Sequence, residues 1–336
     1  MPVPALCAPS GVTRKRTSGQ ERQDPGSRGL RPPAGSGKDS AGGGTRLACP
    51  RPLRYRVSVN RTLVIAHRGA RSLAPENTLA AAQKGLEVGA DLWETDVGVT
   101  ADGVLILFHD DSLKRTTNAA EVYPDRAPWT FTEFTFDEIE RLDAGSWFDR
   151  DDPFGQIAAG RVSAAEQAAY VGLRVPTVEE ALVFTRDHDW TVNIELKRLP
   201  PPLEDFPIVP RFFEVMDRVG IAPEQVRLSS FEHRWLEEAR ALRPEVEVQA
   251  LVGFYRDRPI DWDAVAGFQT VNARAMLTPP EKVRELVAAG QRINLFTVND
   301  AEEARAYIEA GVTGLFTDFP QDLVPLAHAA AGKETP

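Results

Sequence analysis

The chain has 336 residues, of which 42% are hydrophobic, and its formal net charge is −10. This length suits one large α/β barrel of about 250 residues with additions, or two ordinary domains, and the apolar content is enough for a sizeable core. No run approaches the roughly 18 apolar residues that a membrane-spanning helix needs, so we expect no stable membrane insertion.

The charge is unevenly distributed along the chain. Residues 1–60 carry 11 Lys and Arg against 3 Asp and Glu, whereas residues 61–336 have a net charge of −18. Residues 1–58 are rich in Gly, Pro, Ser and Arg, so we predict a disordered basic tail there and a flexible C-terminus over 331–336. They lack the apolar stretch of an ordinary secretory signal. A plain flexible tail, residues added by an upstream start, an Arg-rich targeting peptide and a basic arm for nucleic acid or anionic lipid all remain open. The basic residues are scattered, which argues against the arm, and we expect no nucleic-acid partner.

Both cysteines, Cys7 and Cys49, lie in the basic tail. The rest of the chain therefore uses no disulfide, and zinc held by cysteine is excluded there. A cysteine-free acidic core suits a reducing compartment, so we expect a cytoplasmic protein.

Apolar runs alternate with helical periodicities along residues 59–330, which we interpret as one barrel domain. The runs predict strands over 63–66, 92–97, 104–108, 191–197, 226–230, 246–252, 270–273, 293–298 and 314–317. The periodicities predict helices over 75–88, 137–142, 177–186, 206–219, 233–242, 262–268, 280–289, 301–310 and 322–330. Asp102-Gly103 is a turn pair typical of hairpins, so the second and third strands form one unit with an extra strand. The alternation predicts a (β/α)8 TIM-type barrel whose site lies at the C-terminal ends of the strands.

Residues 110–172 interrupt this alternation with Pro, Asp, Gly and aromatic residues. Long excursions from compact domains are usually functional or disordered, so we predict a small insertion, or lid region, over the C-terminal face of the barrel. Within it, residues 158–169 are small and polar, and we expect them to be mobile.

Three carboxylates are candidate metal ligands. Residues two apart in a strand face the same side, so Glu94 and Asp96 point together and repel each other unless a cation lies between them. Glu195 lies in an apolar strand, where an isolated carboxylate is costly to bury. Oxygen ligands favour one hard divalent cation, Mg²⁺ or Ca²⁺, and sequence does not separate the two.

Two histidines flank this pair of carboxylates. His67 and His109 each follow an apolar run, where an imidazole beside a metal suits general acid or base work near neutral pH. We predict that both are catalytic, and sequence does not say which is the acid. His188, His233 and His328 are interpreted as structural.

The chain resembles the glycerophosphodiester phosphodiesterase family over residues 63 to 323. The motifs that carry the resemblance are His67-Arg68-Gly69, Pro75-Glu76-Asn77-Thr78, Glu94-Thr95-Asp96, Asp102-Gly103, His109-Asp110, Arg115-Thr116-Thr117, Glu195-Leu196-Lys197, Ser230-Phe231, Thr297-Val298-Asn299 and Thr317-Asp318. The resemblance implies the same barrel fold, the metal triad and the two catalytic histidines.

The remaining site predictions concern the substrate. Arg68 and Lys197 are predicted to bind the phosphate, and salt bridges to Glu94 or Glu195 are the compatible alternative. Glu76 and Asn77 begin the first helix, where they would orient His67, cap the helix or contact substrate. Phe296 stands where the family often carries Trp, which keeps an aromatic wall without the indole N–H. Asn299 and Asp318 are expected to support the site from behind, or to serve in core packing or as helix caps.

We therefore predict a metal-dependent hydrolase that cleaves small glycerophosphodiesters to sn-glycerol 3-phosphate and an alcohol. Either water or the glycerol 2-hydroxyl attacks, and the second route passes through a cyclic phosphate. The alternatives are a phospholipase D-type enzyme acting on lysophospholipids or sphingomyelin, and a non-catalytic phosphate-binding barrel. No Gly-rich phosphate loop supports nucleotide chemistry, and the oligomeric state is not predicted.

Overall fold

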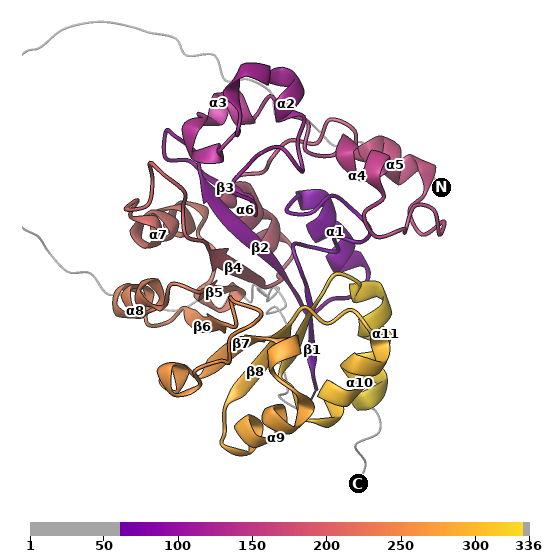
Figure 1. Ribbon diagram of the computed structural model, residues 1–336, viewed down its shortest axis with the longest axis vertical. Helices are drawn as coiled ribbons and strands as arrows, with labels where there is room; N and C mark the ends of the chain where they lie inside the picture. Colours follow the sequence, from indigo (N-terminus) through magenta and orange to yellow (C-terminus); the bar gives the residue numbers. More distant parts are fainter. Residues whose placement is uncertain (1–60, 332–336) are drawn as a thin grey trace, which may run out of the picture. The chain divides into compact units, whose positions relative to one another are not determined.

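Eight parallel strands close into a barrel in residues 61–331, the part of the chain that this computed structural model describes (Figure 1). In barrel order they are β1 (Leu63–Ala66), β2 (Leu92–Val99), β4 (Val192–Leu196), β5 (Val226–Ser230), β6 (Glu247–Val252), β7 (Thr270–Arg274), β8 (Arg292–Phe296) and β9 (Gly314–Thr317). Parallel pairing of β1 with both β2 and β9 closes the circle. The predicted TIM-type barrel is confirmed, whereas the tail over 1–58 and the segment 332–336 lie outside the described residues.

The extra strand of the predicted hairpin is β3 (Leu105–Leu107), which pairs antiparallel with the end of β2. The turn between them places Gly103 at φ +82°, a left-handed conformation that glycine adopts without steric cost. This hairpin carries His109 back toward the mouth of the barrel, because Phe108 N–H donates to the carbonyl oxygen of Asp96.

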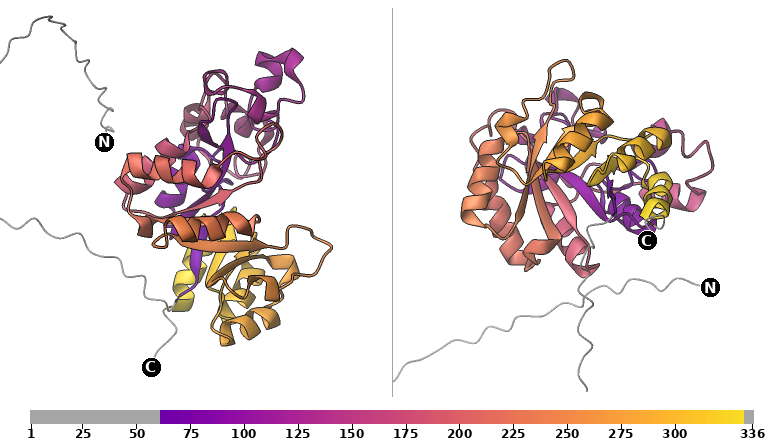
Figure 2. Two further views of the ribbon diagram at one scale, coloured as in Figure 1. Left: turned by 90° about the vertical axis from the view of Figure 1, so that its left-hand side faces the viewer. Right: turned by 90° about the horizontal axis from the view of Figure 1, so that it is seen from below.

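Helices surround the barrel in the order that the sequence predicts (Figures 1 and 2). They are α1 (Leu79–Glu87), α6 (Val178–Asp187), α7 (Ile208–Val219), α8 (His233–Leu242), α9 (Pro280–Ala288), α10 (Ala301–Glu309) and α11 (Pro320–Ala331). The first begins at Leu79 instead of residue 75, because the Thr78 hydroxyl caps it by accepting from Ala81 N–H. The helix predicted over 262–268 is only a 3-10 turn at Asp263–Val265, so a long loop connects β6 to β7. None of the helices in residues 61–331 has the length and apolar character that a bilayer crossing requires.

The insertion contains four short helices, α2 (Ala119–Val122), α3 (Phe136–Ile139), α4 (Ser146–Asp151) and α5 (Ala164–Tyr170). The stretch 158–169, which was expected to be mobile, contains most of α5 in its second half. Ser163 caps α5 through a reciprocal pair with Glu166, and buried Tyr170 donates from its hydroxyl to the Leu73 carbonyl at 3.0 Å. The helix predicted over 137–142 is shorter and begins one residue earlier.

Beneath the mouth, the inside of the barrel is polar on the side of β4 to β8, whereas Ile65, Leu92 and Phe316 form a small apolar cluster on the side of β1, β2 and β9. Side chains alternate along each strand, so the outward residues are apolar and pack under the helices. The inward residues at mid-height are buried amides: Asn193 donates to Gln249 at 2.8 Å, and Asn294 donates to Asn272 at 2.9 Å. This alternation is what directs the site residues, two positions further along each strand, into the mouth.

Candidate active site

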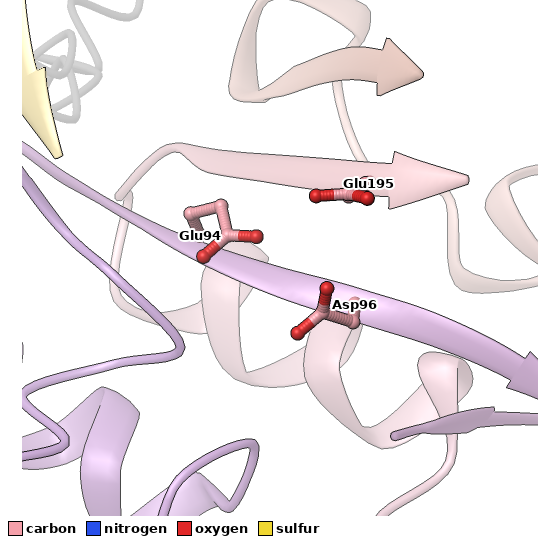
Figure 3. Close-up of side chains that lie close together, drawn as sticks. All are labelled: Glu94, Asp96 and Glu195. Carbon is pink, nitrogen blue, oxygen red and sulfur yellow. The ribbon is translucent and has the colours of Figure 1, made fainter. Parts of the chain in front are cut away.

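Three carboxylates gather across β2 and β4 (Figure 3). Asp96 lies opposite Glu195 in the strand register, and Glu94 precedes Asp96 on the same face. One oxygen from each side chain lies within 4.8 Å of the others, and Glu94 is only 3% exposed. Burial, together with the charges of Asp96 and Glu195, raises the pKa of Glu94 well above its usual range. The cluster therefore favours a cation that would allow all three groups to ionise.

Asn77 holds Asp96 in position. Its side-chain N–H donates to Asp96 Oδ2 at 3.0 Å, and its Oδ1 accepts from the Asp96 backbone N–H at 3.2 Å and the Thr95 hydroxyl at 2.7 Å. The residue has φ +55°, which Asn tolerates better than most non-glycine residues. Asn77 thus has a role that the sequence did not predict, the support of a metal-ligand candidate, and the helix cap predicted for Glu76 or Asn77 is provided by Thr78.

The turn after β1 places Arg68 over the carboxylates. Arg68 has φ +55° and Gly69 has φ +77°, and a Cβ on Gly69 would lie 2.5 Å from the backbone of Ala81. Glycine is therefore required where the turn meets α1. The Arg68 backbone N–H donates to Glu94 Oε2 at 2.8 Å.

The predicted phosphate ligands, Arg68 and Lys197, are both engaged with carboxylates. Arg68 Nη1 lies 2.8 Å from Glu76 Oε1, and its Nε lies 3.4 Å from Asp96 Oδ2. Lys197 Nζ lies 3.6 Å from Asp96 Oδ1 and 3.7 Å from Glu195 Oε1. Burial opposes ionisation of Asp96, but the positive charges of His109, Lys197 and Arg68 outweigh it and hold the pKa of Asp96 below its usual range. The salt-bridge alternative is thus correct for Lys197 with Glu195, while the Arg68 guanidinium pairs with Glu76 and Asp96.

His67 is oriented by a residue from the far end of the chain. Its Nδ1 lies 2.7 Å from Asp318 Oδ1, and Asn299 donates to Asp318 Oδ2 at 2.8 Å. Burial lowers the pKa of His67 below 6.5, and Asp318 opposes this shift. Burial likewise raises the pKa of Asp318, but His67 and Arg71 outweigh it and bring the value to about 2. Asp318 and Asn299 therefore have the supporting roles expected of them, and Asp318 takes the orienting role considered for Glu76.

His109 has its own carboxylate partner. Its Nδ1 lies 2.6 Å from Asp110 Oδ1, and Asp110 Oδ2 accepts from Arg115 Nε at 2.6 Å. Arg115 also donates to Glu76 at 2.7 Å. The sequence predicts no separate role for Arg115 within the Arg115-Thr116-Thr117 motif, and its ion pair with Glu76 makes it part of the site.

Glu76 joins the two halves of the site. Besides Arg68 and Arg115 it lies 3.6 Å from Arg71, which in turn lies 3.5 Å from Asp318. Sequence reasoning missed Arg71, because nothing local separates it from an ordinary surface arginine. One continuous series of polar contacts therefore connects the histidines, through His67, Asp318, Arg71, Glu76, Arg115, Asp110 and His109.

The network carries excess negative charge. Six carboxylates are linked to four cationic side chains, which leaves a net formal charge of −2 with neutral histidines. The carboxylates are Glu76, Glu94, Asp96, Asp110, Glu195 and Asp318, and the cations are Arg68, Arg71, Arg115 and Lys197. A divalent cation on the triad would balance this charge.

The other predicted residues lie apart from this network. Phe296 ends β8, and the guanidinium of Arg274 lies 5.1 Å from its ring centre. His188 and His233 bind backbone carbonyl oxygens at 2.8 and 2.9 Å, and His328 is on α11, so their structural interpretation is retained.

The glycerophosphoryl diester phosphodiesterase family model matches residues 67–322. This chain belongs to that family. A glycerophosphodiester phosphodiesterase of Caldanaerobacter subterraneus is 32% identical over 273 residues, which cover 80% of this chain and 98% of the relative. A second, from Bacillus subtilis, is 30% identical and covers 79% of this chain and 86% of the relative. The chain is therefore an enzyme, a glycerophosphodiester phosphodiesterase.

Solved structures of the family agree with this fold. A phosphodiesterase of Oleispira antarctica, in complex with the product sn-glycerol-3-phosphate, matches with a TM-score of 0.64 and 27% identity, covering 81% of this chain and 98% of that one. A glycerophosphodiester phosphodiesterase of Agrobacterium tumefaciens matches with a TM-score of 0.57 and 26% identity, covering 77% and 97%. Membership of the family gives the reaction class.

Proposed function

We propose that this phosphodiesterase hydrolyses soluble glycerophosphodiesters to sn-glycerol 3-phosphate and an alcohol, with His67 and His109 as its acid–base pair and a divalent cation on the triad. The observation that carries the proposal is the position of the two histidines at opposite ends of one polar network around the carboxylates. The sn-glycerol-3-phosphate bound to the Oleispira antarctica phosphodiesterase supports glycerol phosphate as the half of the substrate that the enzyme recognises.

The triad fits a metal by its chemistry. Glu94, Asp96 and Glu195 offer only oxygen ligands, which suit Mg²⁺ and Ca²⁺ alike. The network's net charge of −2 and the raised pKa of Glu94 both favour a divalent ion. A cation held there would polarise the phosphoryl oxygen.

Each histidine accepts or donates a proton at its Nε2 atom, in exchange with the reacting groups. Each Nδ1 is bound to a carboxylate, which leaves Nε2 to face a reacting group. Burial favours neutral His67, so His67 suits the base that accepts the proton of the attacking hydroxyl. The oxygen–phosphorus bond forms, the bond to the leaving alcohol breaks, and His109, close to the charge of Asp96, gives that alcohol its proton. The attacking group is water or the glycerol 2-hydroxyl, and the two are separated by whether a cyclic phosphate accumulates.

The cations stabilise the charge on phosphorus-bound oxygens. Arg68 and Lys197 are kept protonated, since Asp96 and its neighbours outweigh the effect of burial and raise the pKa of both. When the phosphodiester enters, these two side chains contribute positive charge beside the triad. Glu76 and Asn77 keep Arg68 and Asp96 in place, and Phe296 would give the substrate an aromatic wall.

The test is release of sn-glycerol 3-phosphate from glycerophosphocholine and glycerophosphoethanolamine, first with EDTA and then with Mg²⁺ or Ca²⁺ restored separately. We expect activity to vanish with chelator and to return with one ion, which also identifies that ion. Activity unaffected by exhaustive chelation would contradict the metal proposal. Lysophospholipids should be tested in the same assay. If the enzyme cleaves only lysophospholipids, the proposed soluble substrates are wrong and the substrates are lipids. Recovery of the enzyme in the cytoplasmic fraction of its cell tests the predicted location.

A further inference from the structure

The half of the mouth formed by β5, β7 and β8 lies opposite the acid–base residues in the strand order. Ser229, Asn272 and Asn294 face the barrel interior, where each bonds to an amide of another strand. Side chains two residues further along each strand point to the same side, one layer nearer the mouth. Those residues are Phe231, Arg274 and Phe296.

These side chains contact one another and the loop that follows β6. The ring centres of Phe231 and Phe296 are 6.1 Å apart, and those of Phe231 and Phe254 are 5.2 Å apart. Arg274 lies over Phe296, and its Nε donates to the Gly253 carbonyl oxygen. We call Phe231, Phe254, Arg274 and Phe296 the aromatic wall. The β6–β7 loop, orange in Figure 2, extends from the barrel, and its Phe254 is 61% exposed.

Positive charge on this wall is not neutralised by a carboxylate. Among the residues that the structure describes, the ion pairs within 4.0 Å include neither Arg274 nor Arg256, whereas Arg68, Arg71, Arg115 and Lys197 are all paired. Burial and the positive charge of Arg256 lower the pKa of Arg274, and Glu195 opposes them. Arg256 follows Gly253 by three residues in the β6–β7 loop, and the Gly253 carbonyl oxygen binds Arg274, so the two positive charges belong to the same part of the mouth.

An uncharged ligand would leave these guanidinium groups without a counter-charge. The glycerol half of the substrate has no charge of its own beyond the phosphodiester, which the triad, Arg68 and Lys197 already serve in the proposed function. A second anionic group can come only from the leaving alcohol. Guanidinium groups bind carboxylate and phosphate oxygens through charge-assisted hydrogen bonds, and a half-buried aromatic surface beside them strengthens such bonds by excluding water.

We propose that Arg274 and Arg256, with the aromatic wall, form the subsite for the leaving alcohol and select alcohols that carry an anionic group. This inference rests on the proposed function and adds the class of substrate. The preferred substrates are glycerophosphodiesters whose alcohol carries a carboxylate or a phosphate, and a purely cationic alcohol such as choline is disfavoured.

Glycerophosphoserine and glycerophosphoethanolamine are a matched pair for the test, because they differ only by a carboxylate on the leaving alcohol. We expect kcat/KM of the wild-type enzyme to favour glycerophosphoserine by about tenfold, the range of one charge-assisted contact. Arg274→Gln should reduce this preference to within about twofold, while Arg274→Lys, which keeps the charge, should retain most of it. Arg256→Gln should reduce it by about threefold, in keeping with its exposed side chain.

Arg258→Gln is the control within the same loop, because Arg258 stacks on Tyr255 at 4.1 Å. It removes the same charge, and we expect the preference to change by less than about twofold. If Arg274→Gln lowers kcat/KM equally for both substrates, Arg274 contacts the phosphodiester that they share, and the inference is overturned. A wild-type enzyme that shows no preference for glycerophosphoserine would also overturn it. Calorimetric binding of the two compounds tests the inference separately from turnover. If neither compound is hydrolysed, the proposed function fails. In that case tighter binding of glycerophosphoserine would still support the subsite, and equal binding of the two compounds would reject it.

Discussion

Asp96 and Glu195 lie directly opposite each other on adjacent parallel strands, and both carboxylates enter the same buried cluster. Burial raises the pKa of Glu195 despite the neighbouring Lys197, so its ionisation near neutral pH opposes folding when no cation is present. The strand register thus places carboxylates that repel one another at the position where we propose that a metal binds.

Replacing Glu195 by Gln should therefore stabilise the metal-free enzyme. A raised pKa means that the folded state gains protons over the unfolded state, and that this contribution is lost as pH rises above the ordinary value of 4.5. We expect Glu195→Gln to raise the melting temperature in EDTA at pH 7.5 by about 2–4 °C, which corresponds to about 1 kcal/mol. The same variant should lose activity and the stabilisation by added metal. A lower melting temperature in EDTA would show that the three carboxylates do not repel one another.

Both proposed catalytic histidines can be tested against a third histidine of the same chain. His67→Ala and His109→Ala should each lower kcat by about 10²–10⁴-fold, the usual contribution of general acid–base catalysis, while the protein stays folded at the assay temperature. His188→Ala is the control, because this exposed ring contacts the carbonyl oxygen and the ring of Phe184 at the end of α6 and is not part of the polar network. Near-normal turnover in either of the first two variants would remove that residue from the mechanism.

The pH dependence of catalysis should report the environment of His67. Burial lowers its pKa, so the neutral base persists to more acidic pH, and the acidic limb of kcat/KM should have its midpoint below 6.5. Asp318 opposes this shift, so Asp318→Asn should move the midpoint further toward acid. A profile of the metal-saturated enzyme between pH 4.5 and 8 measures both. A midpoint at or above 6.5 would contradict His67 as the base.

Asp318→Asn should also weaken the fold and catalysis together. The pKa of Asp318 is lowered to about 2, so its stabilisation is present above the ordinary value of 3.8 and is lost as pH falls from there toward 2. We expect the variant to lose about 2 kcal/mol of unfolding free energy at pH 7, and kcat to fall by about 10²-fold as His67 loses its orienting partner. Urea denaturation and steady-state kinetics measure the two effects. Asp322→Asn, which removes an exposed ion pair with Arg161, is the control, and an equal effect there would show that the change is not specific to His67.

Glu76→Gln should be among the most damaging single substitutions in the chain. Glu76 is 6% exposed and faces Arg68, Arg71 and Arg115, so its loss removes the counter-charge that these three guanidinium groups share, although Arg68 keeps Asp96 and Arg71 keeps Asp318. Breaking a buried ion pair costs about 3–5 kcal/mol, and we expect a loss near the lower end because Arg115 keeps Asp110. Glu179→Gln breaks an exposed pair with Arg218 and should cost less than about 1 kcal/mol. Similar denaturation midpoints for the two variants would contradict the linking role of Glu76.

Much of the barrel was predictable because each strand or helix shows its hydrophobic periodicity within its own short stretch of sequence. Within residues 61–331, apolar runs and helical spacing located all nine strands and the seven barrel helices, and the alternation of Glu94 with Asp96 predicted a shared face. The errors lie where local signals are weak. Helix α5 lies in a stretch of small and polar residues, and it docks through Tyr170 to Leu73, a contact between residues 97 positions apart.

Residue types at short spacing were enough to predict the class of fold, the candidate triad and the two candidate catalytic histidines. The folded chain was needed to show that Asp318 binds His67 across 251 positions, that Glu76 binds three arginines, and that Arg274 lies over Phe296. Charged groups interact according to their separation in space, which short spacing in the sequence does not reveal. Closure of the barrel brings β1 and β9 side by side, and with them the residues that follow each strand.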